Sequence, residues 1–328
     1  MENYFILLIL SMKLSKNQLA VLALIIANII WGAAPPIFKW SLEDIQPFTL
    51  AFLRFSLAAV IIFPFVLKKL KIHGKDWPIL IFLSMIGLTF NIAYYFVGLK
   101  LSSSINVPII SSAAPIFIII GSAFFLHEKP KRKVIQGTLI SLIGVLIIVL
   151  RPVFEKGVDS SLIGNLLFVV SMGLSVFFTL LLKEIAHKYN PLTLTFWIFL
   201  ITSLSLLPLV FFEASQTSRL IYFDAKSIIG IIFGSVFSSI IAYGLLAFAI
   251  KYISANEVAV FSYSDPVIAV IIAKPLLGET VTNTFLIGSA LVFLGIFISE
   301  NRLHYHPIHL LRQKPQVEVP KTEIPAHN

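Results

Sequence analysis

Ionisable side chains are rare inside the long apolar runs of this chain, and three of them could carry chemistry there. Asp265 lies well inside one run, directly before Pro266, and Glu257 lies nearer the start of the same run. Arg54 interrupts a different run. At membrane depth a charge is costly and is a functional candidate by default. A carboxylate in such a place could bind an amine or carry a proton, and a guanidinium could attract a carboxylate.

Each of these charges also has a structural interpretation. The Asp265 carboxyl could cap backbone groups that Pro266, which lacks an N–H, leaves without a partner. Glu257 could pair with Lys251 at the membrane interface, and Arg54 could tie neighbouring helices together. We favour a functional role for Asp265 and a structural role for Glu257 and Arg54.

Polar and aromatic side chains inside the runs form a second group of candidates. Aromatic faces bind cations and rings, and polar tips fix the orientation of a bound molecule. The alternative is that Tyr and Trp only mark the membrane interfaces, but Trp31 and Tyr243 lie too deep for that. The candidates for lining a cavity are Asn28, Trp31, Asn91, Tyr94, Tyr95, Tyr243 and Tyr263.

Prolines and glycines punctuate the same runs. Pro36, Pro115 and Pro266 remove backbone hydrogen bonds inside the predicted helices, so they could act as hinges or as static bends. Glycines recur seven residues apart in two runs, which places each pair on one helix face and allows close packing in lipid. We interpret these as packing residues: Gly137, Gly144, Gly288 and Gly295.

The runs that must position these residues are long enough to cross a membrane. A spanning helix needs about 20 mostly apolar residues. The connections between runs are short, so the predicted fold class is an all-α integral membrane protein with no soluble domain inserted. We predict ten transmembrane helices, over residues 17–38, 48–67, 77–98, 104–126, 133–151, 161–182, 191–212, 227–250, 255–277 and 281–299.

Composition excludes several classes of protein. Hydrophobic residues make up 58% of the 328 and charged residues 12%, with a mean hydropathy of +0.94, whereas a soluble domain has roughly twice that share of charge. The net charge of +9 does not indicate nucleic acid, because the basic residues lie in short loops between apolar runs. Cysteine is absent, which excludes disulfides and thiolate metal sites. No other metal or cofactor is indicated.

The sequence repeats itself at a nearly fixed spacing. An offset of 144 residues pairs Lys39 with Lys183, Pro47 with Pro191, Thr49 with Thr193 and Pro64 with Pro208. Further along, an offset of 151 pairs Lys100 with Lys251, Pro115 with Pro266, Glu128 with Glu279, Gly137 with Gly288 and Gly144 with Gly295. Offsets held over so many residues indicate a duplication. Duplicated membrane halves are the common plan of secondary transporters, with the substrate site between the halves.

The distribution of Lys and Arg predicts how the chain crosses the membrane. The N-terminus, the even-numbered connections and the C-terminal tail carry 17 of these residues, the opposite side carries 7, and Arg54 lies within a helix. Cytoplasmic loops carry the excess of positive charge, so both termini are expected in the cytoplasm. Each half then has five helices. An odd number makes the second half enter from the opposite side, as an inverted repeat.

We therefore divide the chain into four segments. They are a cytoplasmic N-terminal extension (1–16), a first repeat (17–151), a second repeat (161–300) and a disordered cytoplasmic tail (301–328). The tail is rich in proline and charge, which is typical of disorder. The very short loops fit a multi-pass protein of a prokaryotic plasma membrane.

Several motifs resemble those of a known family. In the first half they are the segments 47–55 and 114–117, followed by Glu128, Gly137 and Gly144, and in the second half the segments 254–259, 265–267 and 277–279, followed by Gly288 and Gly295. In order and spacing they resemble the drug/metabolite transporter superfamily, in its ten-helix branch with two EamA domains. The resemblance implies export or exchange of small metabolites, often amino acids, through a central cavity. Two positions depart from the family pattern: Asp265 stands where Glu is common, and Ile198 stands where a repeat of Arg54 would fall.

These observations together predict a secondary transporter that exports or exchanges small organic metabolites by alternating access. An apolar cavity with aromatic groups and one carboxylate suits an amino acid or a hydrophobic amine. No Walker motif points to ATP, so proton coupling, exchange and facilitated diffusion stay open. The expected partners are a small-molecule substrate, the lipid bilayer and, in a coupled mechanism, protons. The chain could work as a monomer or a homodimer.

The alternatives are an integral-membrane enzyme and a non-transporting scaffold. An enzyme would need converging catalytic groups, whereas the interior of the runs holds one Asp, one Glu and one Arg, and no His. An inverted duplication has no evident use in a scaffold. We therefore expect a protein that is not an enzyme.

Overall fold

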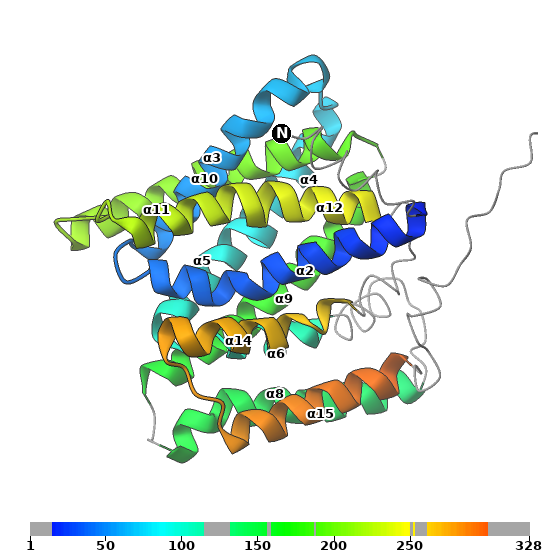
Figure 1. The fold of residues 1–328 in the computed structure, drawn as a ribbon. Helices are drawn as coiled ribbons and strands as arrows, with labels where there is room; N and C mark the ends of the chain where they lie inside the picture. The colour runs from blue at the N-terminus through cyan, green and yellow to red at the C-terminus, as the bar shows by residue number, and fades with distance from the viewer. Residues whose placement is uncertain are drawn as a thin grey trace, which may run out of the picture.

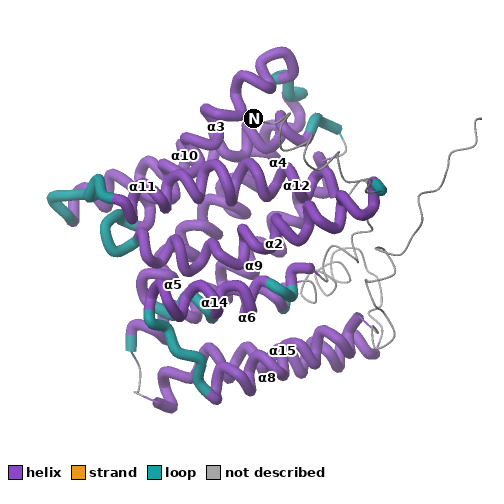
Figure 2. The backbone as a smooth tube through the Cα atoms, in the orientation of Figure 1, coloured by secondary structure: helices purple, strands orange, loops and turns teal. Residues whose placement is uncertain are grey.

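The fold is known from a computed structural model, which describes residues 15–114, 132–155, 159–186, 188–249, 252 and 261–300. Within these ranges the chain is helical, apart from the connections and one isolated antiparallel bridge between Ile45 and Ile221. Figure 2 shows how helices fill most of the traced path and loops gather at their ends. Two predicted site residues, Pro115 and Glu257, lie outside the described residues, as do most of the predicted extension and the whole predicted tail.

The helices of the two halves follow one another in the same order. In the first half they are α2 (Lys16–Ser41), α3 (Pro47–Val66), η1 (Leu67–Lys69), η2 (Gly74–Asp76), α4 (Trp77–Phe82), η3 (Leu83–Phe90), α5 (Asn91–Leu101), α6 (Asn106–Ser112) and α8 (Arg132–Glu155). In the second half they are α9 (Ser160–Ala186), α10 (Pro191–Gln216), α11 (Ala225–Ile232), η4 (Phe233–Ile241), α12 (Ala242–Ala249), α14 (Asp265–Leu277) and α15 (Asn283–Glu300).

Seven helices in the described part are long and apolar enough to cross a membrane. They coincide with seven of the ten predicted spans, and the last predicted span appears as a shorter apolar helix, Asn283–Ile298. The predicted spans 104–126 and 255–277 run over residues that are not described, and α6 and α14 are their described parts. Large apolar side chains such as Val60, Phe65 and Phe211 are exposed. Such a surface fits contact with lipid.

Local sequence explains where the main helices begin. Pro47 and Pro191 occupy the first turn of α3 and α10, where a missing N–H costs nothing and the fixed φ favours the helix. α2 begins with a capping box. The Gln18 N–H donates to the Ser15 hydroxyl oxygen at 3.3 Å, and the Ser15 N–H donates to the Gln18 side chain at 2.9 Å.

The helices stack side by side, and the most extensive contacts join the two halves of the chain (Figure 1). α3 packs along α10 at one end of the stack, and α8 packs along α15 at the other. Between them α2 packs on both α12 and α14, and α5 packs on α9. The largest buried cluster of apolar side chains runs through these interfaces.

The α3–α10 pair is fastened at both ends. At one end the Glu213 carboxylate of α10 accepts the backbone N–H groups of Phe48 and Thr49 at 2.7 and 2.9 Å, and the Thr49 hydroxyl at 2.8 Å. At the other end the Thr193 hydroxyl donates to the Lys69 carbonyl at 3.1 Å. The two helices are therefore antiparallel, and the first N–H groups of α3, which have no partner within their own helix, are satisfied by α10.

Glycines bring α8 and α15 into backbone contact. A Cβ atom on Gly144 would lie 2.6 Å from the Gly288 carbonyl oxygen, and one on Gly295 would lie 2.4 Å from the Gly137 carbonyl oxygen. Both distances are shorter than van der Waals contact, and a Cβ on Gly288 would lie 2.6 Å from Ile148 Cγ1, so Gly144, Gly288 and Gly295 have room only for hydrogen. The predicted packing role of the glycines is confirmed, and the contact is within one chain.

The predicted proline breaks take a different form in the structure. α2 continues as a helix through Pro35 and Pro36. Pro266 lies in the first turn of α14, after a turn at Tyr263 and Ser264, and most of the predicted helix before it lies outside the described residues. Proline lacks only an N–H that would have no helical partner there.

Both halves also contain a wide, π-helical segment, η3 in the first and η4 in the second. The offset of 151 carries η3 onto residues 234–241 of η4. Such segments are rare and often lie at functional sites. Each one changes the angular spacing of side chains, so residues on its two sides face directions that a regular helix would not give.

Candidate substrate site

Arg54 is buried between the two halves. Its side chain reaches from α3 to η4, where Nε donates to the Ser239 hydroxyl at 3.0 Å and Nη2 donates to the Ser238 hydroxyl at 3.1 Å. The guanidinium lies over the rings of Phe38 and Phe55, 5.1 and 4.9 Å from their centroids. It is the only cationic side chain that is buried in the described part of the chain, with 6% of its surface exposed.

Trp31 and Tyr243 meet next to Arg54. Trp31 of α2 donates its indole N–H to the backbone carbonyl of Ser238 at 3.2 Å, so it shares this residue with Arg54. Its ring meets the ring of Tyr243 of α12 edge to face, with 5.3 Å between centroids. Tyr243 is 41% exposed. This aromatic pair therefore extends from the buried cation to the surface of the molecule.

Tyr95 of α5 joins this group of side chains through Phe38, the ring that lies beneath the Arg54 guanidinium. Its ring packs edge to face against Phe38 at 6.4 Å and against Phe96 at 5.2 Å. Phe38 in turn packs against Phe233 of η4 at 6.0 Å. We define the Arg54 cluster as these contacting side chains: Arg54, Trp31, Phe38, Phe55, Tyr95, Phe233, Ser238, Ser239 and Tyr243.

Asp265 lies where α14 crosses α2. A Cβ atom on Gly32 would lie 2.9 Å from the Asp265 carbonyl oxygen, and Gly32 directly follows Trp31 of the Arg54 cluster. The Asp265 Oδ1 atom is buried and makes no hydrogen bond with the described residues. Asn28 is also buried on α2, where its Nδ2 donates to the Leu24 carbonyl at 2.8 Å while its Oδ1 has no hydrogen bond.

The other predicted lining residues lie apart from the Arg54 cluster. Asn91 donates to the backbone carbonyl of Ser171 on α9 at 2.5 Å. Tyr94 is 36% exposed beside Phe90, although its neighbour in sequence, Tyr95, belongs to the cluster. Tyr263 packs against Phe293 of α15, 6.2 Å away.

Sequence reasoning missed the two serines that hold Arg54. Ser238 and Ser239 stand in an apolar run and carry no charge or ring to mark them. The available signal was weak: small polar residues in a membrane helix tend to face other helices and hydrogen-bond across them. Phe38 and Phe233 gave no signal, since Phe is abundant throughout the chain, with 29 residues.

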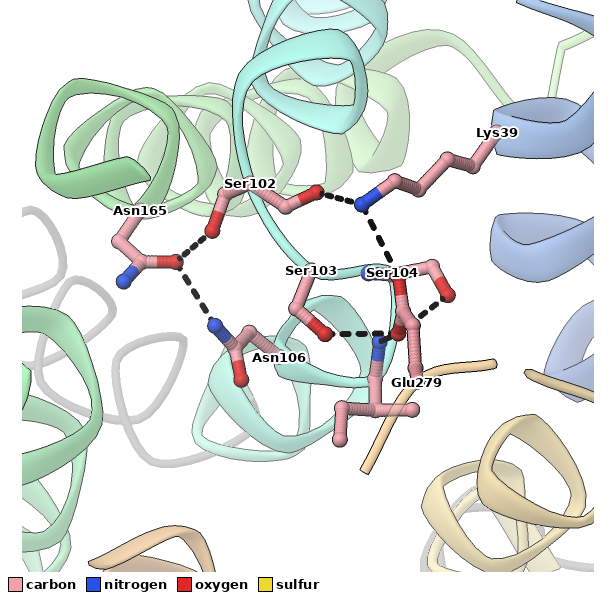
Figure 3. A network of polar contacts seen from close by, with 8 residues as sticks. Lys39, Ser102, Ser103, Ser104, Asn106, Asn165 and Glu279 are labelled. Atoms are coloured by element: carbon pink, nitrogen blue, oxygen red, sulfur yellow. Dashed lines mark hydrogen bonds and ion pairs between the residues drawn. The ribbon is translucent and has the colours of Figure 1, made fainter. Parts of the chain in front are cut away.

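A separate polar network joins three segments at the end of α2 (Figure 3). Glu279, in the connection before α15, forms an ion pair with Lys39 of α2 at 3.0 Å. The same carboxylate accepts the Ser103 hydroxyl at 2.6 Å, and the Ser104 and Ile105 N–H groups at 2.9 and 3.2 Å. It therefore caps the start of α6. The ion pair with Lys39 also fixes the connection before α15 against the end of α2.

The network continues across α5 to α9. Lys39 also donates to the Ser102 carbonyl at 2.5 Å, and the Ser102 hydroxyl donates to Asn165 Oδ1 at 2.6 Å. Asn106 of α6 donates to the same Asn165 oxygen at 2.9 Å. A cavity of about 210 Å³ adjoins the network and is lined in part by Lys39, Lys100 and Glu279.

The charge of Glu279 is predicted to stabilise the folded protein. Burial disfavours the charged form, but Lys39 and the hydrogen bonds from Ser103 and Ser104 outweigh it and hold the pKa of Glu279 below its usual range. The stabilisation is thus complete above the ordinary glutamate pKa and is lost as the pH falls through the lowered one. Glu279→Gln should cost about 2 kcal/mol, or roughly 5 °C in thermal unfolding in detergent.

The matched control is Glu43→Gln, because Glu43 is an exposed carboxylate that pairs with Lys226 near the same end of the molecule. We expect it to leave the unfolding temperature nearly unchanged. Unfolding should also be followed from pH 7 down to about pH 3, below the ordinary glutamate pKa, where wild type should lose stability more steeply than Glu279→Gln. Parallel curves for the two proteins would show that the Glu279 charge is not the stabilising element.

A family model matches both halves of the chain. The EamA-like transporter family matches residues 18–150 and again residues 162–300. These two segments include every residue of the Arg54 cluster. The chain belongs to the EamA-like transporter family. The predicted resemblance to the drug/metabolite transporter superfamily is thereby confirmed, and the protein is a transporter of this type rather than an enzyme.

Curated relatives of this EamA-like protein carry the same class of name. An uncharacterized transporter of Archaeoglobus fulgidus is 26% identical over 88% of this chain and 99% of its own. A second from that organism is 29% identical over 82% of this chain and 94% of its own. A probable amino-acid metabolite efflux pump of Salmonella typhimurium is 27% identical over 85% of this chain and 93% of its own.

A solved crystal structure supports the fold of this EamA-like transporter. It superposes with a TM-score of 0.60 at 19% sequence identity, and covers 87% of this chain and 98% of its own. Among the residues described here, no group of three or more His, Cys, Asp or Glu side chains is placed to hold a metal ion.

Proposed function

We propose that this protein is a secondary transporter that exports or exchanges small organic metabolites by alternating access, with its substrate site at the Arg54 cluster. One observation carries the proposal. The cluster is built from both halves of the chain, since Trp31 and Arg54 come from the first and Ser238, Ser239 and Tyr243 from the second. In duplicated transporters the site lies between the halves, where their relative movement can open it to either side.

The pattern of helix contacts supports an inverted repeat of two five-helix halves. The offset of 144 carries α2 onto α9 and α3 onto α10, and the offset of 151 carries α5 onto α12 and α8 onto α15. The contact between α2 and α12 then has its counterpart in the contact between α9 and α5. Exchanging the two halves maps the α3–α10 contact onto itself, and it maps the α8–α15 contact onto itself. A two-fold axis relating the halves would produce this reciprocity.

Amino acids and hydrophobic amines are the substrates that we favour. The Arg54 cluster is rich in aromatic rings, which suit an apolar or cationic group. A relative of comparable length carries the name of an amino-acid metabolite efflux pump. Asp265 of α14 lies against α2, beside the cluster. It would bind an amine or carry a proton in a coupled mechanism.

Counterflow in proteoliposomes tests the proposal. Purified protein would be reconstituted, and the vesicles loaded in turn with amino acids, aromatic amines and sugar phosphates before tracer is added outside. We expect transient accumulation of an amino-acid or amine class above that of protein-free vesicles. If the protein is inserted and no class accumulates, transport of these metabolites is ruled out.

The proposed orientation places both termini in the cytoplasm of a plasma membrane. A reporter that is active only in the cytoplasm, fused after Arg302, should be active in cells. The same reporter inserted in the connection at Lys156 should be inactive, because that connection lies on the opposite side in the ten-helix topology. Activity in the reversed pattern would overturn the orientation, and equal activity at both positions would overturn the inverted repeat.

A further inference from the structure

The Arg54 guanidinium has more hydrogen-bonding capacity than its surroundings use. An arginine side chain carries five N–H donors. In the described part of the chain Arg54 donates only two hydrogen bonds, both to neutral hydroxyl groups, and makes no ion pair. Nη1 makes no hydrogen bond to the described residues. A polar edge of the cation is therefore left for another acceptor.

The electrostatics of the site favour an anionic acceptor. Buried charges in proteins are normally paired, and a charge at membrane depth marks a substrate or ion pathway when it faces the interior. The rings of Phe38 and Phe55 cover the guanidinium and contribute cation–π attraction, but a neutral ring does not cancel the charge. Hydroxyl groups do not neutralise the charge. The protein has thus buried a cation without supplying its counter-ion in the described part.

The neighbours of Arg54 fit the remainder of such a molecule. Trp31 and Tyr243 lie at one side of the cation, connected through Ser238. Their rings offer apolar faces, and Tyr243 is accessible. One buried positive charge beside aromatic rings matches a monoanion with an apolar group. It does not match a phosphate ester, which carries about two negative charges at neutral pH.

We propose that Arg54 binds the carboxylate of the transported molecule, so that the substrates are small carboxylates with an apolar or aromatic group, including amino acids, and amines without a carboxylate are not substrates. This inference rests on the proposed function and narrows its substrate class. A guanidinium binds a carboxylate through two parallel N–H···O bonds. The two serine hydroxyls hold the cation in place before the substrate arrives.

Direct binding to the purified full-length protein tests the inference without assuming transport. The probes are L-phenylalanine, 3-phenylpropionate, which lacks the ammonium group, and phenethylamine, which lacks the carboxylate. We expect both carboxylates to bind to wild type and phenethylamine to bind at least about 10-fold more weakly, the loss of one charge-assisted pair. Arg54→Gln should weaken the binding of both carboxylates about 10- to 100-fold and leave the binding of phenethylamine unchanged.

Two further variants separate this role from a structural one. Lys274→Gln removes an equal charge from an exposed position of α14 and should leave all three affinities unchanged. Arg54→Lys keeps the charge but loses the fork of donors, so it should bind the carboxylates with intermediate affinity. If Arg54→Gln does not fold, the comparison of the three probes on wild type still decides whether binding requires a carboxylate.

The outcomes that overturn the inference are distinct from failure of the proposed function. Equal binding of phenethylamine and the carboxylates, absence of binding by either carboxylate, or unchanged carboxylate binding in a folded Arg54→Gln would each overturn it. Counterflow of amines alone would also do so, while leaving the protein a transporter. Absence of counterflow with intact carboxylate selectivity in binding would instead contradict transport.

Discussion

Asp265→Asn is expected to abolish transport while the protein inserts and purifies like wild type. The substitution keeps the size of the side chain and removes only its ability to ionise. The Asp265 Oδ1 atom is buried and has no hydrogen bond among the described residues, so little structure depends on it. A buried carboxylate without a partner is costly to keep. We attribute its presence to a bound amine or a carried proton, and expect at least about a 100-fold loss, the scale of one ionic contact.

The measurement is counterflow in proteoliposomes with equal amounts of inserted protein. Asp265→Glu, which keeps the charge on a longer arm and matches the residue common in the family, serves as the control and should keep part of the activity. Thermal unfolding should place all three proteins within a few degrees of each other. Full transport by Asp265→Asn would reduce Asp265 to a structural group at the α2–α14 crossing.

Gly144→Ala is expected to disrupt the packing of α8 against α15. The added Cβ would lie 2.6 Å from the Gly288 carbonyl oxygen and 2.8 Å from the Val292 backbone nitrogen. Both atoms belong to the backbone of α15, so the clash is relieved only when the helices separate along their shared face. We expect a cost of about 3 kcal/mol, at the upper end for overpacking, and a fall in unfolding temperature of roughly 5 to 10 °C.

Gly173→Ala is the matched control. The chemical change is the same, but Gly173 is exposed on α9 and a Cβ there would meet nothing within 4 Å. Alanine favours a helix over glycine by roughly 0.5–1 kcal/mol, so this variant should be as stable as wild type or slightly more so. Thermal unfolding monitored by light scattering or tryptophan fluorescence compares the two. Equal stability of Gly144→Ala and wild type would mean that α8 and α15 pack less closely than the structure has them.

Much of the fold could be predicted from the sequence because the membrane limits the possibilities. The length of an apolar run follows from bilayer thickness, so predicted spans such as 48–67, 161–182 and 191–212 correspond closely to α3, α9 and α10. Pro47 and Pro191, which the sequence marked only as repeat partners, lie in the first turn of α3 and α10. The seven-residue glycine spacing predicted a packing face, although the partner helix could not be read from it.

The candidate site was only partly predictable, since a sequence does not say which residues of different helices meet. Arg54 was chosen as a charge inside an apolar run, Trp31 and Tyr243 as deep aromatic residues, and Tyr95 as a polar aromatic residue within a run. The structure brings these four together. Trp31 and Arg54 both bind Ser238 of η4, and the wide turns of η4 change the directions of its side chains.

Tyr94 and Tyr95 show why helical periodicity alone does not predict which residues line this site. In a regular helix the predicted pair Tyr94 and Tyr95 would point about 100° apart, so at most one could enter a narrow site. The structure partly buries Tyr95 against Phe38 and leaves Tyr94 exposed beside Phe90. Because η3 immediately precedes α5, no helical wheel drawn from the start of the run could decide which of them turns inward.

Glu213, the α10 carboxylate that holds the first amides of α3, determines when those amides can exchange hydrogen with solvent. The first amides of most helices exchange with solvent through fraying, independently of the rest of the molecule. Here the amides of Phe48 and Thr49 are held by Glu213, a residue of another helix. They can take up deuterium only when α3 and α10 come apart at this end. Their exchange rate therefore reports how often this helix pair separates, which makes them natural probes of movement between the two halves.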